Sequence, residues 1–332
     1  MSDWLEALRA LGDTPAVLVT VVRVRGSAPR PAGTKLVVTA DAVAGSIGGG
    51  NLEYQAIRQA REQLGSNRLQ LQDYPLGPAL GQCCGGHVSL LFEPLTPRPE
   101  WPAWIDDTPG MLITDEAGRK TWVTAETATG PAGATLVARA RERLDATAAE
   151  LAGGDEGFTL FEPLRPPDFQ IALFGAGHVG RALVRVLAPL PCRIRWIDDR
   201  AGEFPDALAA NIERILSEDP PEEVDDLPAG GYVLAMTHSH ALDEAICERV
   251  LRRGDQRYLG LIGSRSKRAR FEQRWRRAGL DAARIGELTC PIGLPGIDGR
   301  TPAEIAVAVA AQLLLIRSGA EVTSTPIRAA DA

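Results

Sequence analysis

The stretch that decides the fold is Phe169–Arg200, "FQIALFGAGHVGRALVRVLAPLPCRIRWIDDR". An apolar run leads into a glycine turn, a helix-forming stretch and a second apolar run that ends in two aspartates. This order predicts strand, turn, helix and strand, the first unit of a parallel sheet. The glycines follow the G-x-G-x-x-G spacing of a dinucleotide-binding turn, at Gly175, Gly177 and Gly180.

In such a turn the first glycine permits the tight bend, the second lets a phosphate approach the backbone, and the third lets helix and strand pack closely. The amides at the helix start then attract the phosphate. Asp198 closes the second strand, where a carboxylate suits a ribose hydroxyl and disfavours a 2′-phosphate. We therefore predict a phosphate-bearing ligand here, and the competing interpretation is a Rossmann-like turn without a dinucleotide. His178, inside the motif, either touches that ligand or only covers the turn.

The chain after Asp198 continues to alternate between strand and helix patterns. "GYVLAMTHSH" and "RYLGLIG" read as strands, while "ALDEAICERVLRRG" and "SRSKRARFEQRWRRAG" read as helices. Thr301 and Pro302 open a long final helix, "TPAEIAVAVAAQLLLIR", as N-cap and first helical residue. This alternation predicts a Rossmann-like domain with a mostly parallel, doubly wound sheet over residues 167–318, followed by a flexible tail over 319–332.

Two further loops follow predicted strands of this domain, where ligands of open α/β sheets bind. His238 and His240, with Asp243, have the spacing of metal ligands, and a hydrogen-bonding pair at the mouth of the cleft explains them equally well. Basic residues at a helix start are unfavourable unless an anion is present. Three residues at the start of the next helix are therefore candidate phosphate contacts, with a solvated face as the alternative: Ser264, Arg265 and Lys267.

The first half of the chain has a different pattern. "AVLVTVVRVRG" and "TKLVVTA" are β-branched runs that predict strands, and "NLEYQAIRQAREQLG" predicts a helix. We expect an N-terminal α+β domain over residues 1–166, ending at the proline-rich "RPPDF". The phrase "LFEPL" occurs at 91–95 and again at 160–164. Coincidence explains this repeat, since its composition fits a strand and its exit, and five residues cannot establish a duplication.

A glycine turn precedes the predicted helix of this domain. Gly48, Gly49 and Gly50 stand before a first turn that holds Glu53. Successive amides at a helix start can cradle an anion, and three adjacent glycines are entropically expensive. We predict a close backbone approach by a ligand here, against the alternative of a flexible turn.

The segment Cys83-Cys84-Gly85-Gly86 sets two thiols beside two glycines. Adjacent cysteines do not pair easily, because the disulfide geometry is strained. Buried small hydrophobes are one interpretation. The other is a pair of exposed loop thiols that bind a soft metal or pass sulfur.

Composition excludes several classes of protein. The 332 residues are 45% hydrophobic and 24% charged, with a formal charge of -7, so no basic field favours nucleic acid. The chain has no apolar run of bilayer length and no basic-then-apolar start. We therefore expect a cytoplasmic protein without membrane contact, whose five cysteines form no disulfide framework.

Taken together, these stretches resemble the XdhC/CoxI family of molybdenum hydroxylase accessory proteins, most closely the branch that serves xanthine dehydrogenase in purine catabolism. In the first domain the resemblance rests on "RVRGSAPRPAGTKLVV", "GSIGGGNLEYQA" and "LGPALGQCCGG". In the second it rests on "LFGAGHVGRALV", "WIDDR", "MTHSHALD", "YLGLIGSRSKRARF" and "CPIGLPGIDGRTPAEIAVAVAAQLLL".

The resemblance implies a chaperone without its own turnover, which binds the molybdenum cofactor (molybdopterin). It would hold the cofactor during sulfuration, with a cysteine desulfurase as sulfur donor, and deliver it to the molybdenum-binding subunit of apo-xanthine dehydrogenase. We further predict that Cys84, with Cys83 beside it, lies near the molybdenum end of the bound cofactor, where it would ligate the metal, protect it or face the incoming sulfur. Cys83 is not matched in most of the family, where a single cysteine precedes the two glycines. A homodimer, joined through the Ala- and Leu-rich last helix, is expected.

Two other functions compete with this one. An NAD(P)-dependent oxidoreductase would use the Gly175–Gly180 turn, but no Tyr-x-x-x-Lys pair supplies a hydride-transfer partner in the second domain. A phosphate-sensing regulatory module would leave the cysteine loop unexplained.

Overall fold

The computed structural model describes residues 3–76, 86–95, 99–105, 108–154, 157–165, 167–297 and 299–319. The chain divides into two compact units, residues 1–166 and 167–332. Among the described residues, no helix combines the length and the apolar composition that a bilayer crossing requires.

The second unit contains one six-stranded parallel sheet with the order β13-β12-β11-β14-β15-β16. The strands are β11 (Gln170–Phe174), β12 (Arg193–Asp198), β13 (Ile212–Leu216), β14 (Tyr232–Ala235), β15 (Tyr258–Leu261) and β16 (Leu288–Thr289). The strand order reverses between β11 and β14, as it does in Rossmann folds. The predicted Rossmann-like fold with its parallel sheet is confirmed.

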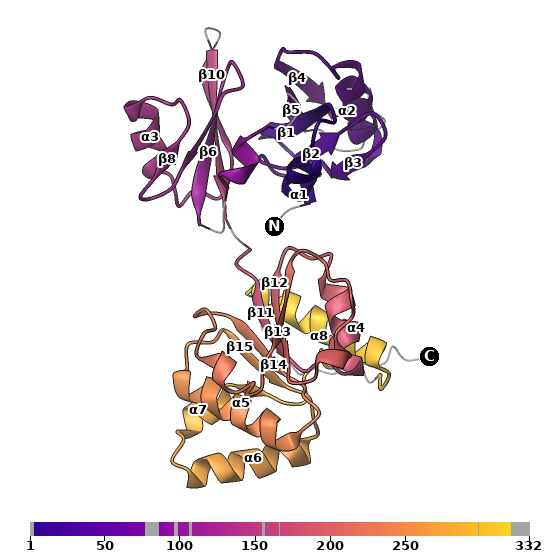
Figure 1. Cartoon of the computed structure of the whole chain (residues 1–332), viewed down its shortest axis with the longest axis vertical. Coiled ribbons are helices and arrows are strands. Elements are labelled where there is room, and N and C mark those ends of the chain that lie inside the picture. Colours follow the sequence, from indigo (N-terminus) through magenta and orange to yellow (C-terminus); the bar gives the residue numbers. More distant parts are fainter. Residues whose placement is uncertain are drawn as a thin grey trace. The chain divides into compact units, whose positions relative to one another are not determined.

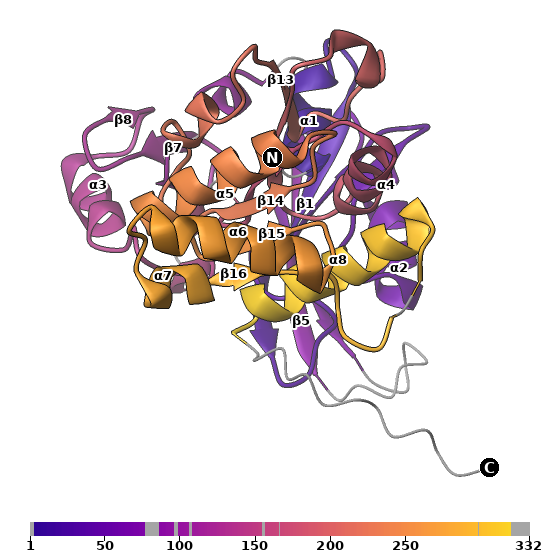
Figure 2. The ribbon, with the colours of Figure 1, turned by 90° about the horizontal axis from the view of Figure 1, so that it is seen from below.

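Helices cover both faces of this sheet (Figure 1). They are α4 (His178–Leu187), α5 (His240–Arg253), α6 (Arg265–Arg277), α7 (Ala282–Gly286) and α8 (Pro302–Arg317), with short 3₁₀ turns η3 (Ala201–Glu203) and η4 (Glu222–Val224). One apolar core joins the sheet to α4 and α8, which pack side by side. The other joins it to α5, α6 and α7, the orange helices of Figure 2. The sheet is therefore doubly wound.

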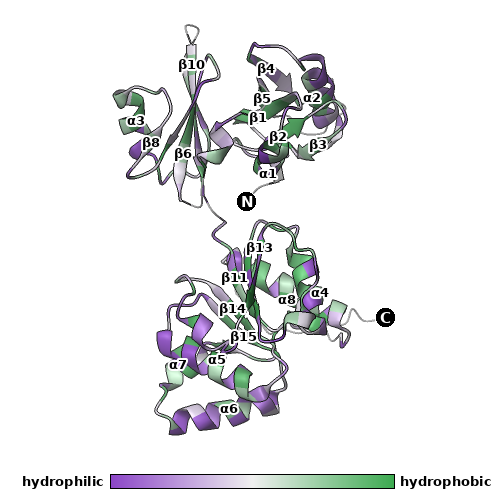
Figure 3. Cartoon of the chain, viewed as in Figure 1, coloured by the Kyte–Doolittle hydropathy of each residue, from purple (hydrophilic) through white to green (hydrophobic). Residues whose placement is uncertain are grey.

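The pattern of polar and apolar residues explains how much of each helix is buried. Helix α6 is mostly polar, as its purple colour in Figure 3 shows, and buries only three side chains, among them Phe271 and Trp275. Helix α8 is apolar along most of its length because it packs against both the sheet and α4. Thr301 caps it in a reciprocal capping box with Glu304, as a Thr-x-x-Glu sequence predicts.

The first unit holds two antiparallel sheets of five strands each, drawn in indigo and magenta in Figure 1. The first sheet has the order β3-β2-β1-β5-β4. Its elements are α1 (Asp3–Ala10), β1 (Ala16–Arg25), β2 (Lys35–Val38), β3 (Val43–Gly45), α2 (Gly50–Glu62), β4 (Gln70–Pro75) and β5 (His87–Leu95).

The second sheet has the order β8-β7-β6-β10-β9. Its elements are η2 (Trp101–Ala103), β6 (Gly110–Asp115), β7 (Lys120–Val123), β8 (Ala128–Thr129), α3 (Ala134–Arg141), β9 (Glu150–Gly154) and β10 (Gly157–Leu164). The two orders are the same when strands are counted within each sheet, and each "LFEPL" ends the strand that returns beside the first. The repeat therefore falls at the same place in two sheets of the same strand order.

Candidate functional site

The glycine turn lies at the carboxyl end of β11, at the point where the strand order reverses. Gly175 has φ +118°, and a Cβ there would come closer than 3.0 Å to the backbone of Met236, at the end of β14. A Cβ on Gly180 would press equally closely on the Gly175 carbonyl. The fold itself therefore requires these two glycines.

Gly177 differs from both of them. Its φ of −67° is open to any residue, and a Cβ there would meet nothing within 4 Å. It is the N-cap of α4, and no side chain caps that helix start. Nothing in the described fold requires glycine here, so the missing side chain leaves room for a ligand at the free amides of α4.

Asp198 is turned into the protein. Its side chain is 2% exposed and accepts hydrogen bonds from Ala176 N at 2.6 Å and from Arg200 Nε and Nη2 at 2.9 and 3.0 Å. Burial disfavours the charged carboxylate, but the hydrogen bonds from Arg200 and Ala176 hold the Asp198 pKa below its usual value. The predicted contact of Asp198 with a ribose stays a prediction, and it would require Arg200 to move.

The neighbouring Asp199 is 30% exposed, and its Oδ1 lies 3.7 Å from His238 Nδ1, across from the end of β14. Among the described residues, Asp198, Asp199 and His238 offer possible metal-ligand atoms within 4.8 Å of one another. The Arg200 guanidinium lies 2.9 Å from Asp198 and 3.6 Å from Asp199, so its positive charge already offsets part of the negative charge of this acidic group. Asp199 escaped the sequence analysis, although the doubled acid in "WIDDR" was its signal.

Asp243 is buried and does not join His238 and His240. Its Oδ1 accepts hydrogen bonds from the amide and hydroxyl of Thr237 at 2.9 and 2.8 Å. Its Oδ2 accepts one from Lys267 Nζ at 2.5 Å. The metal-ligand interpretation of this motif is therefore wrong as to Asp243, which instead ties the loop after β14 to helix α6. The two histidines, like His178, are exposed.

The three candidate phosphate contacts at the start of α6 have different surroundings. The Ser264 hydroxyl caps α6 by accepting from Lys267 N, and Arg265 is exposed. Lys267 Nζ points inward to Asp243 and to the Ile262 carbonyl, 3.0 Å away. A phosphate contact therefore stays a prediction for these residues, and Lys267 would have to leave its ion pair to make one.

In the first unit, the glycine turn before α2 already surrounds a carboxylate. Glu53 Oε2 accepts hydrogen bonds from the Ser46 hydroxyl, Ile47 N and Gly49 N at 2.7, 2.9 and 3.1 Å. Burial works against the charged form, but these donors hold the Glu53 pKa below its usual value. The turn predicted to bind an external anion therefore already binds the carboxylate of Glu53 through its amides. A Cβ on Gly49 would meet nothing within 4 Å, so the outer side of the turn is open.

Of the cysteine loop, Gly86 is described, and a Cβ there would press on the Ser27 carbonyl, so this glycine is required by packing. Cys83, Cys84 and Gly85 lie outside the described residues. The described thiols, Cys192, Cys247 and Cys290, are all buried. Burial raises the pKa of each, to about 11 for Cys192, and so disfavours the thiolate form that reacts.

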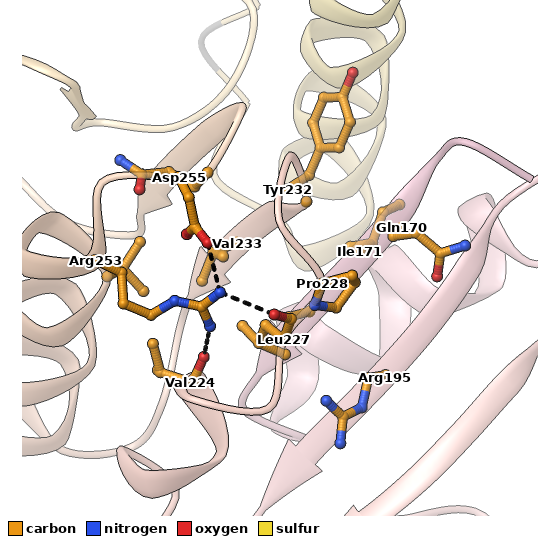
Figure 4. A pocket seen from close by; sticks show the side chains of 14 residues that line it. Gln170, Ile171, Arg195, Val224, Leu227, Pro228, Tyr232, Val233, Arg253 and Asp255 are labelled. Carbon is orange, nitrogen blue, oxygen red and sulfur yellow. Dashed lines mark hydrogen bonds and ion pairs between the residues drawn. The ribbon is translucent and has the colours of Figure 1, made fainter.

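A pocket opens at the opposite, amino-terminal end of the parallel strands (Figure 4). It lies beside Gln170 and Tyr232, at the starts of β11 and β14, and its cavity volume is about 20 Å³. That is room for about one water molecule, far less than a dinucleotide or pterin needs. Arg253, which lines it, donates to the Leu227 carbonyl and to Asp255. This pocket is not a cofactor site.

Comparison with known proteins agrees with the geometry. A family model described as the XdhC Rossmann domain matches residues 171–313, and a model of the XdhC and CoxI family matches residues 11–75. The chain belongs to the XdhC and CoxI family. The resemblance predicted from the sequence motifs is confirmed.

Two curated relatives of this XdhC-family chain come from Escherichia coli K12. YqeB is 29% identical over 187 residues, which are 54% of this chain and 33% of YqeB. The molybdenum cofactor insertion chaperone PaoD is 38% identical over 84 residues, which are 24% of this chain and 26% of PaoD. The chain therefore spans about a third or less of the length of either relative.

A solved structure, titled as a xanthine dehydrogenase from Bacillus halodurans, covers 98% of both chains with a TM-score of 0.74 and 23% identity. At this identity the likeness shows the fold alone.

Proposed function

We propose that this chain is a chaperone that binds the molybdenum cofactor, holds it during sulfuration and delivers it to apo-xanthine dehydrogenase, without turnover of its own. Membership of the XdhC and CoxI family supports this role. So does the name of the relative PaoD, a molybdenum cofactor insertion chaperone.

The observation that carries the proposal is the open position at Gly177. The cofactor has a phosphate, and the uncapped amides of α4 offer it hydrogen bonds and positive partial charge. A Cβ at 177 would project into the space that the phosphate needs. His178 and His238, both exposed beside the turn, would then contact the rest of the ligand.

The proposal extends to the partners and to the location. A cysteine desulfurase would supply the sulfur, Cys84 would face the molybdenum, and the protein would act in the cytoplasm. A homodimer would use helix α8, on which Val307 and Leu314 lie two turns apart and are 51% and 40% exposed.

The nicotinamide-dependent oxidoreductase is the rival function, since its ligand would occupy the same turn. The bonds that Asp198 makes to Ala176 and Arg200 favour the cofactor over NAD, because they engage the carboxylate that would bind the ribose.

The test is to purify the chain from cells that make the molybdenum cofactor and to analyse what the denatured protein releases. A fluorescent oxidised pterin at about one per chain or per dimer supports the chaperone, and bound nicotinamide supports the rival. Added to apo-xanthine dehydrogenase with cofactor, the chain should raise its activity. Equal reconstitution by free sulfurated cofactor, under the same exposure to oxygen, would remove the support for a chaperone.

A further inference from the structure

The two sheets of the first unit repeat one plan. In each, three strands form a meander, a helix follows the third strand, and a hairpin returns its last strand beside the first. We call residues 3–95 the first copy and residues 99–164 the second copy. Strand β1 corresponds to β6, β2 to β7 and β5 to β10.

The strand registers agree residue by residue. In the first copy, Lys35 lies opposite Thr20, and Glu93 lies opposite Leu18, two residues earlier on the same strand. In the second copy, the same four places are held by identical residue types: Lys120 opposite Thr114, and Glu162 opposite Leu112. Such agreement of pairing and residue type on both sides of the first strand does not arise from composition alone.

The lysines and glutamates are exchanged between the copies. Lys35 of the first copy forms a buried ion pair with Glu162 of the second. Lys120 of the second copy forms one with Glu93 of the first, at 2.6 Å. Both glutamates are the central residue of an "LFEPL" phrase.

The surroundings of the two pairs also match. Lys35 Nζ donates to Thr20 and lies 5.3 Å from the ring of Trp4, before β1. Lys120 Nζ donates to Thr114 and lies 5.2 Å from the ring of Trp101, before β6.

The glycines that close each meander match too. A Cβ on Gly45 or on Gly130 would press on the carbonyl of the lysine of its own copy. Both glycines have positive φ, +86° and +130°. The same backbone crossing therefore occurs in both copies.

The copies differ at the helix that follows. Counted from the N-caps Gly49 and Gly133, Ala56 of α2 and Ala140 of α3 occupy the same place, and both are fully buried. In this alignment Glu53 corresponds to a valine at 137, and the first turn of α3 holds no acid. The glycine turn that surrounds a carboxylate thus belongs to the first copy. The connection between the last two strands also differs, residues 76–86 in the first copy against 155–156 in the second.

We propose that residues 1–166 are an internal duplication, a fused dimer whose copies recognise each other through the exchanged Lys–Glu pairs, and that the first of these two copies contacts the ligand while the second does not. The contact between the first copy and the ligand rests on the proposed function. In a copy alone, the apolar side chains that the other copy covers would be exposed, and each lysine and glutamate would lose its counter-ion, so we expect neither copy to be stable by itself. The exchange therefore fits each copy to a second copy of the same fold.

The chain offers a direct readout, because it has only three lysines and all three are buried. Acetylation of the full chain, followed by mass spectrometry, reports the exposure of Lys35, Lys120 and, as a reference in the second unit, Lys267. Glu162→Gln should speed acetylation of Lys35 by about tenfold or more, and Glu93→Gln should do the same for Lys120. Lys267 should stay protected in both variants. Exposure of the lysine in the same copy as the substitution would overturn the exchange.

If the variants do not fold, a second measurement on the wild-type chain tests the same proposal. In the wild-type chain, with increasing urea, Lys35 and Lys120 should become reactive together, since both lie between the copies. Reactivity in two separate steps would contradict the fused dimer.

The contact between the first copy and the ligand is tested by a separate variant, Glu53→Val, which places in α2 the residue type that α3 has at the corresponding position. Cofactor retention should fall about tenfold or more, with Lys35 and Lys120 still protected. Full cofactor retention by this variant would contradict a role of the first copy in ligand binding, and it would not affect the proposed duplication. If the wild-type chain retains no cofactor, the proposed function fails, and the lysine measurements still decide the duplication.

Discussion

The Asp198 carboxylate accepts a hydrogen bond from the Ala176 amide at 2.6 Å, so the end of β12 holds the middle of the glycine turn after β11. The same carboxylate holds both the backbone and the guanidinium of Arg200. A residue that sequence reasoning assigns to a ligand therefore shapes the turn that would bind it.

This relationship predicts a stability effect that depends on pH. An unfolded aspartate titrates near about 3.9, and the folded Asp198 pKa is lower. The stabilisation is therefore present above about pH 4 and is lost as the pH falls through the folded value. Asp198→Asn should lower the free energy of unfolding at pH 7 by about 1–3 kcal/mol.

Melting temperature against pH checks this prediction. The difference between wild type and Asp198→Asn should shrink in acid, while Asp206→Asn, at an exposed site, should match wild type throughout. A difference that stays constant between pH 7 and pH 3 would mean that the charge of Asp198 contributes nothing.

The three glycines of the turn should respond differently to alanine. Gly177→Ala should weaken ligand binding with little change in melting temperature, because a Cβ there meets no protein atom. Gly180→Ala should lower the melting temperature, since its Cβ would press on the Gly175 carbonyl. Gly202→Ala, also at an open position, is the matched control and should change neither property. Unchanged cofactor retention in a folded Gly177→Ala protein would make the turn purely structural.

Thiol labelling of the native chain should separate two classes of cysteine. Burial raises the pKa of Cys192, Cys247 and Cys290, so iodoacetamide at pH 7.5 should leave them largely unmodified until the protein unfolds. We expect native labelling at Cys83 or Cys84, which the sequence places in a glycine-rich loop. Peptide mass spectrometry locates the label, and native modification confined to the other three cysteines would refute an exposed loop thiol.

The sequence predicts much of the fold because its period changes with the element type. Alternating strands and helices after Phe169 identify the parallel sheet, and the capping box at Thr301 identifies the last helix. Short strands such as β8 and β16, of two residues each, carry too little pattern to be found.

The site was harder to predict, because spacing does not tell which way a side chain points. Asp198, Asp243 and Lys267 were correctly placed at strand ends or helix starts, yet each turns inward to a protein partner. The proposed duplication was not predicted from the sequence for a related reason. The strongest evidence for it is a set of contacts between residues far apart in the chain.

The cysteine loop gives the sharpest prediction about function. Cys84→Ser keeps the approximate size of the side chain and removes the soft, easily ionised sulfur. If Cys84 faces the molybdenum, delivery of the sulfurated cofactor to apo-xanthine dehydrogenase should drop sharply while the melting temperature barely changes. Cys83→Ser should affect delivery less, because Cys84 alone holds the family's position before the two glycines.

Cys247→Ser is the matched control for packing. Cys247 is fully buried in the core between the sheet and α5. A hydroxyl placed there without a partner should cost about 1–3 kcal/mol of stability, with delivery reduced only as far as the protein unfolds. Melting temperature and reconstitution of xanthine dehydrogenase, measured on all three variants, separate packing from chemistry. A Cys84→Ser protein with normal stability and full delivery would rule out a functional role for that thiol.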